Sequence, residues 1–523
     1  MAVGGAVTTN VTTGVSHLLN PNRKWYNNRR LINLHAWIVL IVIISSANGF
    51  DGSLMNNFQS LWQWEGYFKN PSGSLLGALS AMQNIGSLAA YPFAPYLSDG
   101  IGRRATIFLG AIITLVGVAL QSAAYNIGMF IGGRFLIGFG VCFATNAAPM
   151  LVTEISYPTY RAPLTSVYNS LWYSGNVIAS WVTFGTAYIP NEWSWRVPSL
   201  IQGIPSVLQL FLIMLAPESP RWLISKGKEA EGLKILAYYH ADGDDQDPLV
   251  QFEFEEIKAS IEFEQHLYKD VGWLTLFKTP GNRKRMMLAC AIAWFSQWSG
   301  NGLVSYYLNK VFDTIGITNT TIQLLITGIL AIWNLVISIS ASFLVDRLGR
   351  RPLFLWATGG CLVFFTLQTI CSARYALEPQ PATAHAVIAF IFLYYGFYDL
   401  AYTPLIVTYT VEILPNSLRA KGLTVYSVMV SLSLIFNQYV NPIALQRIAW
   451  KYYIFYCCWI AFEFVFIFFF LVETKNRTLE ETAALFDDNA AEVLPVVITE
   501  EGPQDKMSET EKSMEKVIEG AST

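Results

Sequence analysis

Apolar runs of about twenty residues recur along the whole chain, and they constrain its fold more than any other feature. A helix needs about 20 apolar residues to cross the roughly 30 Å of hydrocarbon in a bilayer. The backbone polar groups of such a span must be bonded inside the protein, and a helix bonds them internally. Charged residues make up only 14% of the 523 residues, against roughly 25% in soluble domains. These features predict an all-α protein embedded in the lipid bilayer.

Twelve spans can be placed, six before and six after a long polar stretch. They cover residues 34–55, 75–97, 105–124, 127–150, 163–187, 196–216, 285–309, 321–345, 353–373, 385–411, 422–444 and 451–472. The chain therefore divides into two six-helix halves, a linker and two flanking segments. We predict these divisions at residues 1–33 (N-terminal segment), 34–216 (first half), 217–284 (linker of short helices), 285–472 (second half) and 473–523 (acidic tail, largely disordered).

Basic residues gather in alternate loops, and this pattern sets the orientation expected in the membrane. Arginine is frequent in the N-terminal segment and in the loops after the second and eighth spans, whereas the intervening loops carry few basic residues. Both termini and the linker are thus expected in the cytoplasm. Residues 1–30 lack the apolar stretch of a cleavable signal peptide. We predict a multi-pass protein of the plasma membrane that functions as a monomer.

Several classes of function lack their sequence signatures in this chain. It has no G-x-S-x-G, no nucleotide-binding loop and no metal-ligand spacing, so we expect no enzyme, no ATP-driven pump, no cofactor and no metal. The six cysteines lie in apolar runs without a C-x-x-C pair, which favours small apolar packing residues. Acidic and basic residues are mixed in the linker, so no nucleic-acid partner is expected.

Charged segments at the ends of the predicted spans recur in the same order in both halves. Asp99-Gly-Ile-Gly-Arg-Arg104 matches Asp346-Arg-Leu-Gly-Arg-Arg351, and the stretch from Glu154 to Arg161 matches that from Glu412 to Arg419. Pro217-Glu218-Ser219 likewise matches Val472-Glu473-Thr474. Such a parallel repeat is typical of transporters whose halves rock about a central binding site.

The repeated segments mix carboxylates with arginines, which pair in bidentate forks. Exposed pairs are individually weak, so a network would be needed to latch the cytoplasmic side in one state and release it in another. The residues predicted to form this gate network are Asp99, Arg103, Arg104, Glu154, Arg161, Glu218, Arg221, Asp346, Arg347, Arg350, Arg351, Glu412, Arg419 and Glu473.

Asp51 places a carboxylate in the first span, where a charge costs at least about 2.5 kcal/mol on insertion scales. Arg134 lies in the fourth span of the same half. Two buried charges of opposite sign in one half are best explained by each other, because an unpaired buried charge is costly.

Together these segments resemble the sugar porter family of the major facilitator superfamily over about residues 33–482. The resemblance rests on Asp346-Arg-Leu-Gly-Arg-Arg351, Gly133-Arg134, Pro217-Glu-Ser-Pro-Arg-Trp222, Ser299-Gly300 with Tyr306-Tyr307, and Glu473-Thr-Lys-Asn-Arg-Thr-Leu-Glu480. Within the family the chain looks most similar to fungal lactose and cellodextrin permeases. The resemblance implies the major facilitator fold, with twelve helices in two halves.

The resemblance also implies a central sugar site lined by helices 1, 4, 5, 7, 8, 10 and 11. The family's site positions fall on Asn169 (a glutamine in the family), Ser296 and Gln297 (paired glutamines), Gly302 (an asparagine), Tyr306 (its first helix-7 tyrosine), Asn334 (an asparagine) and Val407 (a tryptophan). Smaller side chains at several of these positions imply a roomier site than a monosaccharide needs.

Polar groups within the spans support part of this assignment. Gln297 and Asn301 lie four residues apart and are expected on one face of helix 7, with Tyr306 nearby. Amides suit sugars because each offers donors and an acceptor to hydroxyl groups, although any one of them could instead bond a neighbouring helix. Asp399 is a second carboxylate in a predicted span. Asp399 could bind substrate or take part in coupling, form a structural ion pair, or cap a helix.

The resemblance assigns Asp51 to proton coupling. In the family's proton-coupled members an aspartate at this position pairs with the helix-4 arginine, whereas passive members commonly carry a neutral residue. Protonation of Asp51 would free Arg134 and couple sugar binding to the change of state; a static ion pair is the structural alternative. We therefore predict proton-coupled uptake of a sugar, a disaccharide such as lactose or cellobiose, by alternating access. A passive hexose facilitator and a non-transporting sugar sensor are the alternatives.

Overall fold

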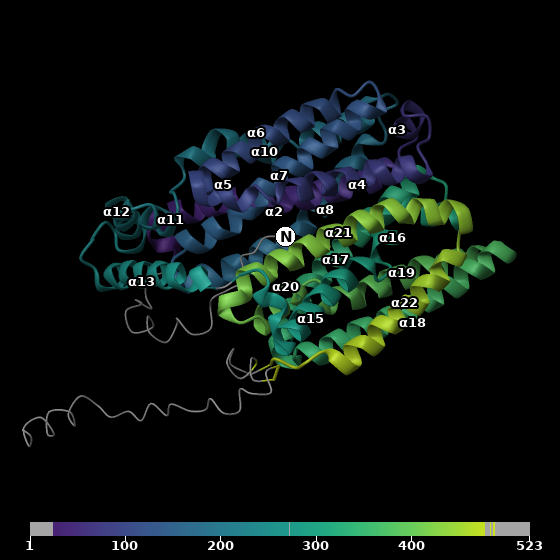
Figure 1. The fold of residues 1–523 in the computed structure, drawn as a ribbon. Helices are drawn as coiled ribbons and strands as arrows, with labels where there is room; N and C mark the ends of the chain where they lie inside the picture. The colour runs from purple at the N-terminus through teal and green to yellow at the C-terminus, as the bar shows by residue number, and fades with distance from the viewer. Residues whose placement is uncertain (1–24, 271, 476–481, 483–484, 487–523) are drawn as a thin grey trace, which may run out of the picture.

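The computed structural model describes residues 25–270, 272–475, 482, 485 and 486. Side chains within 162–170, 263–270, 342–347 and 416–420 are described only in part. The described chain is helical, and two helical bundles lie side by side (Figure 1). The N-terminal segment before Trp25 and most of the predicted tail lie outside the described residues.

The first bundle begins after the short turn η1 (Trp25–Asn27). It consists of α2 (Arg29–Phe58), α3 (Trp62–Tyr67), α4 (Gly73–Ala90), α5 (Ala94–Ile101), α6 (Arg103–Ser122), α7 (Ile127–Ile155), α8 (Pro158–Thr186), α9 (Trp193–Ile201), α10 (Ile204–Leu212) and η2 (Ile213–Leu215). The linker forms α11 (Pro220–Ser225), α12 (Glu229–His240), α13 (Pro248–Asp270) and α14 (Thr275–Lys278). Helices α11, α12 and α13 gather at one end of the molecule, and α3 lies at the opposite end (Figure 1).

The second bundle follows the linker directly. It consists of α15 (Pro280–Trp298), α16 (Asn301–Thr314), α17 (Thr320–Leu348), α18 (Arg350–Leu377), α19 (Pro381–Ala401), α20 (Leu405–Ile413), α21 (Asn416–Ile448) and α22 (Lys451–Phe470). With α4–α5, α9–α10, α15–α16 and α19–α20 each taken as one interrupted span, the two bundles hold the twelve spans of the predicted all-α membrane fold.

Four of the predicted spans are interrupted in the structure. Residues 75–97, 196–216, 285–309 and 385–411 each form two helices. Between α15 and α16, Gly300 has a φ of +96°, a conformation that a helix cannot contain and that glycine adopts without strain. Between α19 and α20, Pro404 precedes the second helix, and a proline cannot donate the backbone hydrogen bond that would continue the first.

Nine helical segments among the described residues are long and apolar enough to cross a membrane. The three spans that are not in this set are α4–α5, α8 and α15–α16. These three spans carry many of the amide and hydroxyl side chains that line the cavity described below. Their lower hydropathy therefore has a structural reason, because their polar faces turn towards the cavity between the bundles.

Within the first bundle, glycines allow helices to touch backbone to backbone. A Cβ added to Gly49 of α2 would lie 1.9 Å from the carbonyl oxygen of Trp172 in α8. A Cβ added to Gly175 of α8 would lie 1.8 Å from the carbonyl oxygen of Ser46 in α2. Close approach of this kind is how membrane helices gain packing where lipid tails compete for apolar contacts.

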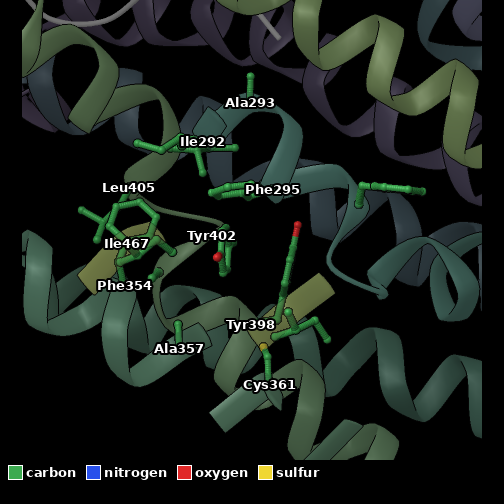
Figure 2. Close-up of a cluster of buried hydrophobic side chains, with 14 of the residues drawn as sticks. Ile292, Ala293, Phe295, Phe354, Ala357, Cys361, Tyr398, Tyr402, Leu405 and Ile467 are labelled. Carbon is green, nitrogen blue, oxygen red and sulfur yellow. The ribbon is translucent and has the colours of Figure 1, made fainter. Parts of the chain in front are cut away.

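The second bundle has a core rich in tyrosine. Figure 2 shows Tyr398 of α19 beside Cys361 of α18, with Tyr402, which directly follows α19, in the same cluster. The rings of Tyr398 and Tyr402 are stacked, with centroids 5.1 Å apart and an interplanar angle of 15°. The hydroxyl of Tyr402 lies 2.8 Å from that of Thr358, so the polar end of this ring is satisfied inside the core.

The bundles meet along α4 with α21, α8 with α17, and α2 with α16. At the end remote from the linker, the Asn309 side chain donates to the carbonyl of Gln59 (2.7 Å), and the backbone N–H of Leu308 donates to Asn56 (3.0 Å). Nearby, Lys310 Nζ lies 2.7 Å from a carboxylate oxygen of Glu65 in α3. We call this set of contacts the α2–α16 seal, and it joins the two bundles at that end.

Candidate transport pathway

A cavity of about 230 Å³ lies between the two bundles. Side chains from α2, α4, α7 and α8 of the first bundle line it, together with side chains from α15, α16, α17, α19, α20 and α21 of the second. The cavity is thus a site that neither bundle forms alone. Helix α4 is an addition to the helices that the resemblance implies.

Four of the residues predicted to bind substrate line the cavity: Gln297, Asn301, Tyr306 and Asn334. The Asn301 amide donates to the hydroxyl of Tyr398 at 3.0 Å, while its carbonyl oxygen has no hydrogen-bond partner. The side-chain oxygen of Asn334 also has none. These buried acceptors are available to the hydroxyl groups of a ligand, since a buried polar group is costly when left unpaired.

The route by which Gln297 and Asn301 reach the cavity differs from the prediction. They were expected on one face of a continuous helix, but α15 ends at Trp298 and α16 begins at Asn301. Both side chains nevertheless line the cavity, because the interruption at Ser299 and Gly300 turns the chain there. The side chain of Asn169 lies outside the described part of the structure.

Several amides of the cavity wall were not singled out from the sequence. They are Asn48, Asn56, Gln83, Asn84, Asn176 and Gln438. Asn84 of α4 donates to Gln438 of α21 at 2.7 Å, so this pair spans the two bundles. A weak signal was present, because Asn48, Gly52 and Asn56 recur every four residues and therefore share one face of a helix.

The described residues that line the cavity include no aspartate, glutamate, lysine, arginine or histidine. The wall consists of amides, hydroxyl groups, aromatic rings and aliphatic side chains. A charged ligand would meet no opposite charge on this wall. The composition suits a neutral ligand with many hydroxyl groups, which amides can bind as donor and acceptor at once.

Asp51 and Arg134 lie behind the wall, 1% and 2% exposed. The Arg134 guanidinium donates to the side-chain oxygen of Gln83 at 2.9 Å, and Gln83 lines the cavity. The two charges act on each other through space, yet no Arg134 nitrogen lies within 4.0 Å of an Asp51 oxygen in the described structure. One Asp51 oxygen and two Arg134 nitrogens have no hydrogen-bond partner. Gln83 thus connects the arginine to the cavity.

Asp399 is fully buried near the end of α19. One of its oxygens, Oδ1, accepts hydrogen bonds from the hydroxyls of Tyr173 (2.6 Å) and Thr403 (2.7 Å). The other oxygen, Oδ2, has no partner. Among the described residues Asp399 forms no ion pair within 4.0 Å. Tyr173 and Thr403 both line the cavity, so Asp399 lies directly behind its wall.

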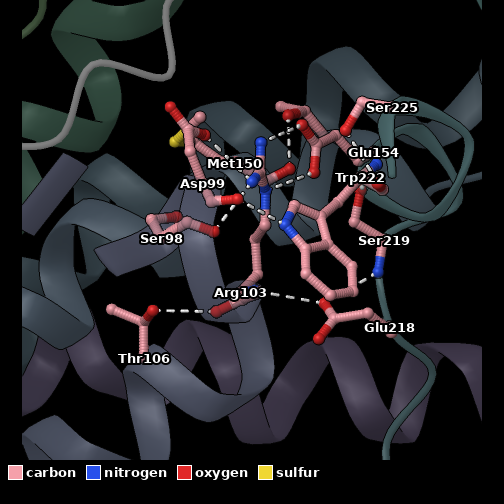
Figure 3. Close-up of polar contacts among 12 residues, drawn as sticks. Ser98, Asp99, Arg103, Thr106, Met150, Glu154, Glu218, Ser219, Trp222 and Ser225 are labelled. Carbon is pink, nitrogen blue, oxygen red and sulfur yellow. Dashed lines mark hydrogen bonds and ion pairs between the residues drawn. The ribbon is translucent and has the colours of Figure 1, made fainter. Parts of the chain in front are cut away.

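In the first half, the gate residues form a compact cluster around Arg103 (Figure 3). The Arg103 guanidinium lies 3.1 Å from carboxylate oxygens of both Glu154 and Asp99. Glu218 accepts from the backbone N–H groups of Arg103 (3.2 Å) and Arg104 (3.3 Å), at the start of α6. A carboxylate at a helix N-terminus satisfies free N–H groups and favours the helix dipole. The cluster therefore joins α5, α6, α7 and the start of the linker.

The second half repeats this arrangement. The Arg350 guanidinium lies 2.9 Å from Glu412, and Glu473 accepts from the backbone N–H groups of Arg350 and Arg351 at 3.0 Å each. Partial burial raises the pKa of Glu473, but these and two further backbone N–H donors lower it more, so its pKa lies below the ordinary value. The side chains of Asp346 and Arg347 lie outside the described part of the structure.

Three remaining arginines of the predicted network make other contacts. Arg161 lies 3.7 Å from Glu253 of α13, Arg221 donates to Ser260 of α13 at 3.3 Å, and Arg419 donates to the carbonyl of Leu414 at 3.4 Å. Each of the gate contacts described here lies within one half, between the first half and the linker, within the linker, or between the second half and Glu473 at the start of the tail. In this state the gate contacts stabilise each bundle separately and do not join the two bundles.

Comparisons with known proteins agree with this architecture. Residues 37–486 match the family described as "Sugar (and other) transporter". The high-affinity glucose transporter of Kluyveromyces lactis is 29% identical over 485 residues, covering 87% of this chain and 86% of that protein. The quinate permease of Emericella nidulans is 28% identical, with 83% of each chain covered. The particular likeness to lactose and cellodextrin permeases stays a prediction.

Solved structures show the same fold. The inward-open conformation of the xylose transporter XylE from E. coli has a TM-score of 0.72 at 22% identity, covering 87% of this chain and all of that one. The XylE proton:xylose symporter bound to 6-bromo-6-deoxy-D-glucose has a TM-score of 0.68 at 24% identity. The family model spans most of the chain, and the two bundles enclose a cavity as in a carrier. This chain belongs to the sugar (and other) transporter family of membrane carriers, and it is not an enzyme.

Proposed function

We propose that the protein carries a neutral sugar together with a proton across the plasma membrane, with both termini in the cytoplasm. The observation that carries the proposal is the uncharged wall of amides and hydroxyls between the bundles, with Asp51 and Arg134 buried directly behind it. An anionic substrate such as quinate would find no cation on the described wall. A neutral substrate leaves the buried charges free for coupling.

Proton coupling is proposed to act through Gln83. Arg134 bonds Gln83, which faces the cavity, and in this state makes no close ion pair with Asp51. When Asp51 takes up a proton, Arg134 loses its opposing charge and can bond Gln83 and the substrate side. When Asp51 loses the proton, its charge attracts the guanidinium back. Substrate binding and protonation thereby favour the same conformation, which is the requirement for coupling.

The α2–α16 seal supports alternating access. With the linker on the cytoplasmic side, as proposed, the seal closes the outer end of the pathway. The substrate would then exchange with the cytoplasm in this state. The opposite state requires the contacts of Asn309 and Leu308 across the bundles to break, while the gate clusters of the two halves approach one another.

The size of the sugar is the finer part of the proposal. Three of the four reduced side chains do not enlarge the cavity here: Ser296 and Val407 are not part of its wall, and a Cβ at Gly302 would lie 1.9 Å from the amide of Asn437. Asn437 of α21 thus occupies the space that a larger residue at 302 would need. A disaccharide such as lactose or cellobiose stays a prediction, to be compared directly with hexoses and xylose.

Uptake into proteoliposomes that contain the purified protein tests the proposal. We expect one or more labelled sugars from a panel of glucose, xylose, lactose and cellobiose to accumulate when an inward proton gradient is imposed. A protonophore should abolish the accumulation, and unlabelled quinate should not compete. Equilibration without accumulation would establish a passive facilitator instead. Binding of sugar without any flux would favour the sensor alternative.

A further inference from the structure

The hydrogen bond between Tyr173 and Asp399 connects the two bundles at the cavity wall. Tyr173 belongs to α8 of the first bundle and Asp399 to α19 of the second, and the hydroxyl lies 2.6 Å from Oδ1. We propose that Asp399 is a second proton-binding site of the pathway, and that its charge sets the strength of this bond between the bundles. The proposal rests on the carrier function proposed above and adds a site distinct from Asp51.

The hydrogen bonds of Asp399 place the proton on one particular oxygen. Both hydroxyl donors, from Tyr173 and Thr403, are directed at Oδ1. Oδ2 is buried without a donor. A charged carboxylate would leave half of its charge unsatisfied there, which is costly inside a protein. A carboxylic acid with its proton on Oδ2 and its carbonyl oxygen at Oδ1 satisfies both hydroxyl donors in this state.

The surroundings of Asp399 supply no compensating charge. The titratable groups that act on it or on its immediate neighbours are Tyr173 of α8, Tyr306 of α16, Cys361 of α18, Tyr395 and Tyr398 of α19, Tyr402 directly after α19, and Glu463 of α22. None of these groups is basic. No ion pair of Asp399 is found in the described part of the chain. The charge of this carboxyl is therefore controlled by a proton rather than by a cation.

The hydroxyl partners of Asp399 connect its Oδ1 oxygen to the cavity. Tyr173 and Thr403 line the cavity, and their hydroxyls lie 3.1 Å apart. A hydrogen bond to a charged acceptor is roughly twice as strong as one between neutral groups. Loss of the proton therefore strengthens the bond from Tyr173 and holds α8 against α19. Uptake of the proton weakens the bond and lets the bundles move relative to each other.

Glu463 provides a matched control within the same bundle. It is fully buried in α22, and neither of its oxygens has a hydrogen-bond partner. It interacts with Cys361 and Tyr402, but it is not part of the cavity wall and makes no described contact with the first bundle. Glu463 thus shares burial and the lack of a cation with Asp399, and differs in having no link to the other bundle.

The test measures equilibrium exchange of a labelled sugar in proteoliposomes, with equal pH on both sides and with D51N as the background. The sugar is glucose or whichever member of the uptake panel the protein carries. We expect exchange by D51N to slow as the pH rises, and this pH dependence to be lost in D51N/D399N and in D51N/Y173F. D51N/E463Q should keep it. A flat profile for D51N, or an unchanged profile in D51N/D399N, would overturn the proposal.

An infrared measurement covers the case in which a double variant does not transport. The carboxylic-acid carbonyl band of the full-length protein should lose intensity in the single variant D399N at neutral pH, and an unchanged band would overturn the proposal. The two proposals can fail separately. If wild-type protein shows no proton-driven accumulation while D399N still removes the pH dependence of exchange, the symport proposal fails and the Asp399 site stands.

Discussion

Two buried carboxyl groups flank the cavity, one in each half, and their environments differ. Asp51 faces a guanidinium in its own bundle, at a distance too long for an ion pair. Asp399 faces only hydroxyl groups, one of which belongs to the other bundle. The difference teaches that burial alone does not define a role. The charge of Asp51 interacts with Arg134 inside one bundle. The charge of Asp399 instead affects a hydrogen bond between the bundles, because Tyr173 belongs to the other bundle.

Of the variants that test this comparison, Asp51→Asn should have the largest effect. The amide cannot lose or gain a proton near neutral pH, so we expect complete loss of accumulation against a gradient, with exchange retained. Proton-driven uptake in proteoliposomes measures the first quantity, and exchange at equal pH measures the second. Glu463→Gln is the control and should retain both. Undiminished accumulation by Asp51→Asn would assign coupling elsewhere.

Arg134→Gln would make the environment of Asp51 resemble that of Asp399. Removing one partner of a buried charge pair costs up to about 3–5 kcal/mol of stability, and we expect a lower value here because the charges are not in contact. Thermal unfolding in detergent should show a clear drop in Tm. The double variant Asp51→Asn with Arg134→Gln should recover part of it, since no unpaired charge remains. Additive losses would contradict an interaction between the two residues.

Lys310→Gln probes the α2–α16 seal rather than the charges behind the wall. Lys310 and Glu65 are about 30% exposed, and such pairs contribute about 0.2–1 kcal/mol. We expect a shift of at most about fivefold in the ratio of the two open states. Labelling of single-cysteine variants on either side of the cavity would report that ratio. The proton dependence of uptake should not change, and a changed dependence would connect the seal to coupling.

Glu473→Gln should have the smallest effect near neutral pH. Since the pKa of Glu473 lies below its ordinary value, the charged carboxylate stabilises the fold above that value, and the contribution is lost as the pH falls through the lowered pKa. The variant should therefore unfold at a slightly lower temperature at neutral pH. The difference should shrink as the pH falls below about 4.3 and disappear only below the lowered pKa of Glu473. A difference that grew in acid would contradict this sign.

The sequence predicted the twelve spans well because hydrophobic length is a local property. The interruptions at Gly300 and Pro404 were missed, since both residues also occur inside membrane helices, where neighbouring groups can satisfy the freed backbone. The positions of Gln297, Asn301, Tyr306 and Asn334 on the cavity wall followed from family positions and polarity. The bond from Tyr173 to Asp399 could not be predicted, because it depends on how two bundles that are distant in sequence come together.

The uncharged cavity wall has a consequence for how such a carrier can diversify. Groups on the cavity wall that are proposed to contact the ligand, such as Asn334 and Gln438, are separate from those proposed to hold protons, Asp51 and Asp399, which lie behind the wall. A substitution among the amides could therefore exchange one cargo for another without altering the energy source. Conversely, an inherited change at a carboxyl could turn an accumulating carrier into an equilibrating one with the same preference. The substrate preference and the proton coupling of such a carrier could therefore evolve independently.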